Sequence, residues 1–157
     1  MNASDHIFAI AEFCEKIGLT VCLHDFDLNL AGQYDHDKRL IRLNEPNVES
    51  ALMALAHELG HYVGYLIYGS NTNRSRSQLH RERQAYVYGW IILKWFRATS
   101  VISRERWIAE CRASHEGFVQ AQVDKSKINT RLISANASSS PTPITVLSDG
   151  GFIFGGC

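Results

Sequence analysis

The chain has 157 residues, of which 45% are hydrophobic, and its formal net charge at pH 7 is zero. This length can bury one core but is short for two ordinary domains, and the balanced charge disfavours direct nucleic-acid binding. The N-terminus lacks the cationic start and apolar core of a signal peptide, and the longest apolar run, 85–93, is too short to span a bilayer. We therefore expect a cytoplasmic protein with no membrane partner.

The first third of the chain predicts a helix followed by a small sheet. Residues 4–17 have an amphipathic helical pattern that ends at Gly18. Residues 20–24 and 28–44 have strand character, and the second segment predicts a hairpin that turns near 35–38. We expect an α+β fold in which a short antiparallel sheet of about three strands packs on a helical core.

The most informative motif follows the hairpin and has the sequence His57-Glu58-Leu59-Gly60-His61. On a helix, two histidines four residues apart lie on one face with Cβ atoms about 6 Å apart, so both imidazoles can reach one Zn²⁺. The glutamate would lie beside the metal and take a proton from a zinc-bound water. H-E-x-x-H is the known motif of zinc peptidases. The alternative is two core histidines that flank a glutamate by chance.

The flanking sequence predicts the helix that this motif needs. Apolar residues recur every three or four positions over 48–68, with Asn47 as a plausible N-cap and Gly69 as a natural stop. Gly60 and Gly64 are each unfavourable in a helix. Their spacing predicts a second helix that passes closely over them.

A catalytic zinc usually has three protein ligands and one open position. The metzincin pattern would need a histidine at position 67, where this chain has Ile67, so the third ligand must come from elsewhere. Residues 78–97 predict another helix, whose buried face begins with Glu82 and includes the small residues Ala85 and Gly89. A buried carboxylate is costly unless it is paired or binds a metal. Glu82 is therefore the predicted third ligand.

Other residues compete for that role. His80 is close in sequence but lies on a different helix face, and Glu105 and Glu110 belong to a later helix where we expect them to be solvated. The alternative role for the predicted third ligand is an ion pair with Arg81 or Arg83.

The two metal motifs, 57–61 and 82–85, resemble those of the ImmA/IrrE-type metallopeptidases and other compact gluzincins. The segments 32–35 and 39–44 are similar to the β-hairpin that enters the zinc helix in such proteins. The resemblance covers roughly residues 5–97. It implies a zincin-like fold and an intracellular zinc endopeptidase, often carried by phages and mobile elements, whose substrates are commonly helix-turn-helix repressors.

These patterns predict a Zn²⁺-dependent hydrolase of peptide bonds, with a protein or peptide substrate that adds a strand to the sheet near 40–43. Glu58 would be the general base. One alternative is a catalytically silent zinc-containing protein that regulates a partner by docking, although such a protein has no need of Glu58. Another is a DNA-associated protease recruited through an arginine cluster at positions 74, 76, 81 and 83.

Residues 103–123 predict a third long helix, with Trp107, Cys111, His115 and Phe118 on one side. His115 is a candidate for stabilising the oxyanion, since a downstream histidine or tyrosine often does so in related enzymes. The alternative is a histidine that fills an apolar face. The four cysteines form no C-x-x-C pair, so we expect reduced thiols and no structural zinc site.

The end of the chain has a different composition, so we expect a metallopeptidase domain at 1–125 and a linker with an apolar tail at 126–157. Residues 134–143 are rich in Ser, Ala and Pro, and glycine pairs flank the apolar residues 152–154. One hypothesis is that this tail occupies the cleft, in its own molecule or a neighbour, with Cys157 near the zinc. The alternative is that it packs on a distant apolar patch or on a partner.

Overall fold

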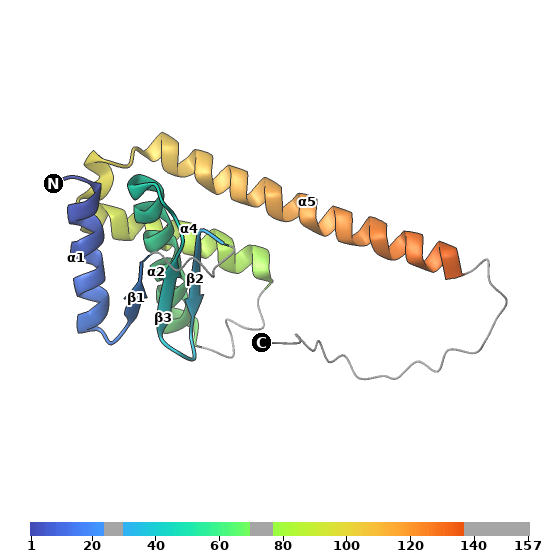
Figure 1. Cartoon of the computed structure of the whole chain (residues 1–157), viewed down its shortest axis with the longest axis horizontal. Helices are drawn as coiled ribbons and strands as arrows, with labels where there is room; N and C mark the ends of the chain where they lie inside the picture. The colour runs from blue at the N-terminus through green and yellow to red at the C-terminus, as the bar shows by residue number, and fades with distance from the viewer. Residues whose placement is uncertain (24–29, 70–76, 137–157) are drawn as a thin grey trace. The chain divides into compact units, whose positions relative to one another are not determined.

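The computed structural model describes residues 1–23, 30–69 and 77–136 of the chain (Figure 1). The chain divides into two units, Met1–Phe118 and Val119–Cys157, and the first holds every residue of the site described below. None of the helices in the described part is both long and apolar enough to cross a bilayer. The elements in chain order are α1 Ala3–Lys16, β1 Thr20–Cys22, β2 Gly32–Asp35, β3 Leu40–Leu43, α2 Val48–Tyr68, α4 Gln78–Trp95, a 3₁₀ turn Ala98–Ser100, and α5 Arg104–Asn136.

The sheet is mixed, so the prediction of an antiparallel sheet is only partly right. The strand order is β1-β3-β2, with β2 antiparallel to β3 and β1 parallel to it. The sequence predicts the hairpin of β2 and β3. It does not predict the pairing of β1 with the other edge of β3, because these two strands are not neighbours in the sequence. The predicted substrate edge near 40–43 is also wrong, since these residues form the central strand. Within the described residues, the edge of β2 that faces away from β3 pairs with no other strand.

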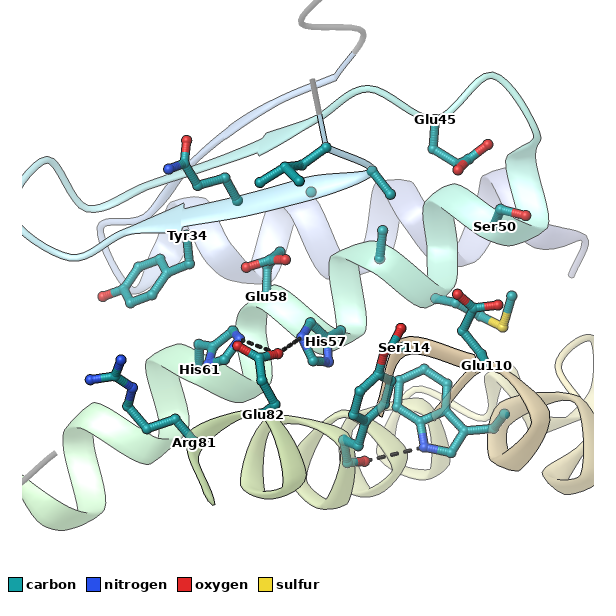
Figure 2. Close-up of a pocket in the computed structure, with 18 of the residues that line it drawn as sticks. Tyr34, Glu45, Ser50, His57, Glu58, His61, Arg81, Glu82, Glu110 and Ser114 are labelled. Carbon is teal, nitrogen blue, oxygen red and sulfur yellow. Dashed lines mark hydrogen bonds and ion pairs between the residues drawn. The ribbon is translucent and has the colours of Figure 1, made fainter. Parts of the chain in front are cut away.

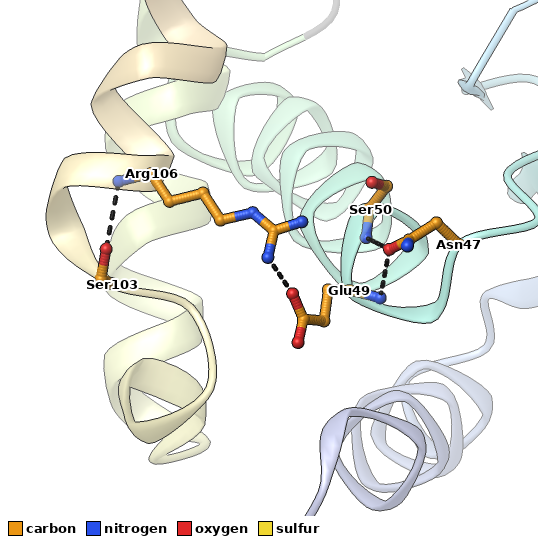
Figure 3. A network of polar contacts seen from close by, with 5 residues as sticks. All are labelled: Asn47, Glu49, Ser50, Ser103 and Arg106. Atoms are coloured by element: carbon orange, nitrogen blue, oxygen red, sulfur yellow. Dashed lines mark hydrogen bonds and ion pairs between the residues drawn. The ribbon is translucent and has the colours of Figure 1, made fainter.

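Helix α2 has the predicted bounds for the predicted reasons. The Asn47 side chain accepts hydrogen bonds from the backbone N–H groups of Glu49 and Ser50, each at 3.0 Å (Figure 3). Such a cap satisfies donors that the first turn leaves free. At the other end, Gly69 has a φ of 72° and its N–H donates to the carbonyl of Tyr65. Glycine adopts this left-handed conformation without strain.

Helix α4 packs on α2 through backbone contacts at two glycines. A Cβ atom at Gly60 would collide with the carbonyl oxygen of Ala85, and one at Gly89 would lie 2.9 Å from the carbonyl oxygen of Ala56. The prediction of a close crossing is confirmed for Gly60, Ala85 and Gly89. It is wrong for Gly64, where a Cβ atom would meet nothing within 4 Å. This crossing brings the start of α4 against the middle of α2.

We expect Gly60→Ala to lower the free energy of unfolding by about 1–3 kcal/mol, because the added methyl group must push α4 away from α2. Chemical denaturation of the metal-free protein measures the change. Gly64→Ala is the matched control on the same helix, and its better helix propensity should leave stability unchanged or raise it by up to about 1 kcal/mol. Equal losses in the two variants would show that the crossing does not depend on Gly60.

Helix α5 begins beside α2 and runs further than predicted. Arg106 forms an ion pair with Glu49, at the first turn of α2 (Figure 3). The helix passes position 126, where the sequence predicts a linker, and ends at Asn136. Residues 118–136 contain no glycine or proline, so this part of α5 has no helix-breaking residue.

The core lies between α1, the sheet and α2, and it includes one thiol. Ile10, Cys14, Ile41 and Leu52 are completely buried. Burial raises the pKa of Cys14 to about 11, so this thiol stays protonated and unreactive. The described cysteines are free, as the sequence predicts, and Cys157 lies outside the described residues.

Candidate metal centre

Helices α2 and α4 bring the three predicted ligands together. His57 and His61 lie one turn apart on α2, and Glu82 faces them from the first turns of α4 (Figure 2). The Glu82 Oε2 atom is 3.2 Å from Nε2 of His57 and 3.6 Å from Nε2 of His61. The close crossing at Gly60 makes this approach possible.

The spacing of these ligand atoms fits one metal ion. Bonds of roughly 2.0–2.1 Å around a tetrahedral Zn²⁺ place neighbouring ligand atoms about 3.3 Å apart, close to the two measured separations. One ligand atom from each residue lies within 4.8 Å of the other two, and no second group of this kind occurs in the part of the chain that the structure describes. Two imidazole nitrogens and one carboxylate oxygen form a donor set that suits zinc.

The electrostatics of Glu82 and Glu58 differ sharply. Burial would raise the pKa of Glu82, but hydrogen bonds and charges from His57 and His61 outweigh it and hold this pKa well below its usual range. Burial raises the pKa of Glu58, against the opposing charges of the two histidines. Glu82 is thus an ionised donor, and Glu58 is a carboxylate with a high proton affinity.

Glu58 lies between the ligand group and the sheet (Figure 2). Its side chain extends from α2 toward β2 (Figure 2), and the residue is only 7% exposed. The backbone N–H of Tyr34 lowers the pKa of this carboxylate, against the larger effect of burial. It lines the same cavity as the three predicted ligands without belonging to the ligand group.

A cleft of about 750 Å³ opens over the ligand group. Strand β2 forms one wall, and parts of α2, α4 and α5 form the others. The carboxylates of Glu45 and Glu110 lie at one end, while Arg81 and Tyr34 lie at the other (Figure 2). The cleft is therefore open to solvent, bordered by a strand, and different in charge at its two ends.

Tyr86 separates this cleft from a neighbouring groove and was not predicted as a site residue. Its ring packs on the imidazole of His57, with centroids 4.2 Å apart. Its hydroxyl donates to Oγ of Ser114 over 2.6 Å, and its carbonyl accepts from the indole of Trp107 over 3.2 Å. Burial raises the pKa of Tyr86 to about 12. The phenol is thus a protonated donor beside the ligand group. Its position one turn after Glu82 was the available sequence signal.

The competing ligands do not reach the group. Glu110 lines the cleft but is not part of the ligand group, and neither His80 nor Glu105 lines the cleft. The ion pairs of Glu82 are with the two histidines and not with Arg81 or Arg83.

His115 lies outside the cleft. It lines the neighbouring groove between α4 and α5, and its Nε2 atom is 3.2 Å from Nη2 of Arg83. This position gives no geometric support to the predicted oxyanion role. Tyr86 and Ser114, unlike His115, line both the groove and the cleft.

No protein-family model, curated protein or solved structure matches this chain significantly. Its function is therefore inferred from the residues of the site. Two hypotheses fall outside the described residues: the arginine cluster, through positions 74 and 76, and the placement of the apolar tail, 144–157.

Proposed function

We propose that this protein is a zinc-dependent endopeptidase that hydrolyses peptide bonds of an intracellular protein. The observation that carries the proposal is the convergence of His57, His61 and Glu82 at an open cleft, with Glu58 beside them. A structural zinc site is normally closed by four protein ligands, whereas a catalytic site keeps a position for water or substrate. Three candidate ligands under an open cleft favour the catalytic kind.

Each residue of the site has its own role in the proposed reaction. The two histidines and Glu82 would hold the metal, which when bound would make a water acidic and polarise the scissile carbonyl. Glu58 would accept the proton of the attacking water and return it to the leaving amine.

The free edge of β2 supports an extended substrate. The N–H of Asn44 donates to the carbonyl of Ala31 at 3.0 Å, so the backbone groups of Ala31 and Gln33 face β3. In an antiparallel ladder the alternate residues, Gly32 and Tyr34, then direct their backbone groups outward. A peptide strand would pair with those groups along the cleft.

The resemblance to ImmA/IrrE-type metallopeptidases makes a helix-turn-helix repressor the first substrate to test. Purified protein should cleave such a repressor, lose the activity to a zinc chelator and regain it when zinc is restored. An unfolded protein of unrelated sequence tests whether the substrate must be folded. Absence of cleavage of either substrate by zinc-loaded protein would favour the alternative, a catalytically silent protein that regulates a partner by docking.

The charges at the ends of the cleft predict a substrate preference. Glu110→Lys should lower kcat/KM about two- to fivefold for peptides with a basic side chain on that side of the cleaved bond, because exposed charge pairs contribute roughly 0.2–1 kcal/mol. Cleavage of paired lysine and glutamate peptides measures the change. Glu105→Lys is the matched control, since Glu105 is exposed on the same helix but does not line the cleft. An equal loss for lysine and glutamate peptides would rule out charge selection by Glu110.

A further inference from the structure

We infer that the edge strand β2 positions the general base, because Gly32 leaves room for the Glu58 side chain. Gly32 is thus a positioning residue for the reaction, in addition to forming part of the edge along which a substrate would lie. This inference rests on the proposed role of Glu58 and assigns a function to a residue that carries no reactive side chain.

The space at Gly32 is taken by Glu58. A Cβ atom at Gly32 would lie 3.0 Å from Cγ and 3.1 Å from Oε1 of Glu58, and 3.2 Å from Cδ2 of Leu43. Contacts this short force a neighbour to move, and two of the three involve the general base. The backbone does not itself require glycine here, because Gly32 is not among the glycines with positive φ, Gly18 and Gly69. Glycine therefore leaves a space that a methyl group would take from the side chains of Glu58 and Leu43.

The backbone of β2 also acts on the charge of Glu58. Tyr34 is one of the residues whose backbone groups face away from β3. Its N–H favours the ionised carboxylate of Glu58 and lowers the pKa of that group, against the larger effect of burial.

These contacts fix Glu58 from two sides. Its backbone belongs to the rigid helix α2, while its carboxylate lies against β2 and is almost fully buried. A base that is held in place needs no reorganisation when the reaction begins.

The test uses a double-mutant cycle on stability, which needs no substrate. In the metal-free full chain, Gly32→Ala should raise the unfolding equilibrium constant about tenfold when residue 58 is glutamate. In a Glu58→Ala background, where the side chain that meets the new methyl group is gone, the same change should raise it less than about twofold. Gly64→Ala, at a glycine with open space, should show no difference between the two backgrounds. Equal costs of Gly32→Ala in both backgrounds would overturn the inference.

Kinetics then separate positioning from general structural damage. Gly32→Ala should keep one zinc per chain and a KM within about twofold of wild type, while kcat falls at least about tenfold because the base is displaced. A raised KM with unchanged kcat would contradict positioning and make Gly32 only a substrate contact. If the wild-type protein hydrolyses no peptide, the proposed function fails, but the stability cycle still decides whether Gly32 accommodates Glu58.

Discussion

Replacement of Glu58 by glutamine should abolish peptide hydrolysis and leave one zinc ion per chain. The amide has nearly the same shape as the carboxylate but cannot accept the proton of the attacking water, so kcat should fall by about 100- to 10,000-fold. Zinc should remain because Glu58 is not part of the ligand group and points toward β2. Single-turnover cleavage and metal analysis of the same preparation measure both effects.

Glu105→Gln is the control for this substitution, because Glu105 is exposed on α5 and does not line the cleft. It should match the wild-type protein in zinc content and in rate. Loss of zinc from Glu58→Gln would mean that Glu58 is a ligand or supports one. Full activity with zinc retained would mean that another group takes the proton.

Replacement of Glu82 by alanine should lower zinc affinity by more than about 100-fold. Changes to residues that only support a metal ligand typically cost 10- to 100-fold, so loss of a direct ligand should cost more. The variant also removes the carboxylate that faces both histidines at 3.2 and 3.6 Å. Competition with a chelator of known affinity measures the change.

Two residues near Glu82 serve as controls. His80→Ala and Glu110→Ala should each change zinc affinity less than about threefold, since neither residue belongs to the ligand group. A larger loss of zinc affinity in either control than in Glu82→Ala would identify that control residue as the third ligand. Unchanged zinc affinity in all three variants would mean that none of the three replaced residues is the third protein ligand.

The sequence predicts the parts of this fold that depend on local patterns. The period of the apolar residues, the Asn47 cap and the stop at Gly69 define α2, and the hairpin turn follows from its strand pattern. The grouping of Glu82 with the two histidines was also predictable. A buried acid at the start of a helix with small residues needs a partner, and the glycine in the zinc motif allows a close crossing.

The remaining features depend on contacts between distant residues. Strand β1 pairs in parallel with β3, which lies far from it in the sequence. No local sequence pattern specifies which strand β1 joins. Gly64 has the same local signature as Gly60, yet only Gly60 meets a neighbouring backbone. In the sequence, Gly32 resembles an ordinary hairpin glycine. Only the structure shows that the side chain of Glu58 lies against it. His115 shares a helix face with Trp107 but lies in the groove beside Arg83.

The most direct test of the proposed zinc centre is a crystal structure of the zinc-loaded protein with anomalous data collected at the zinc absorption edge. We expect one zinc ion in the first unit, bound by Nε2 of His57, Nε2 of His61 and the carboxylate of Glu82, with a fourth position open to the cleft. A catalytic centre would be contradicted by a zinc ion closed by four protein ligands, by zinc bound through other residues, or by no ordered zinc in protein prepared with zinc in excess.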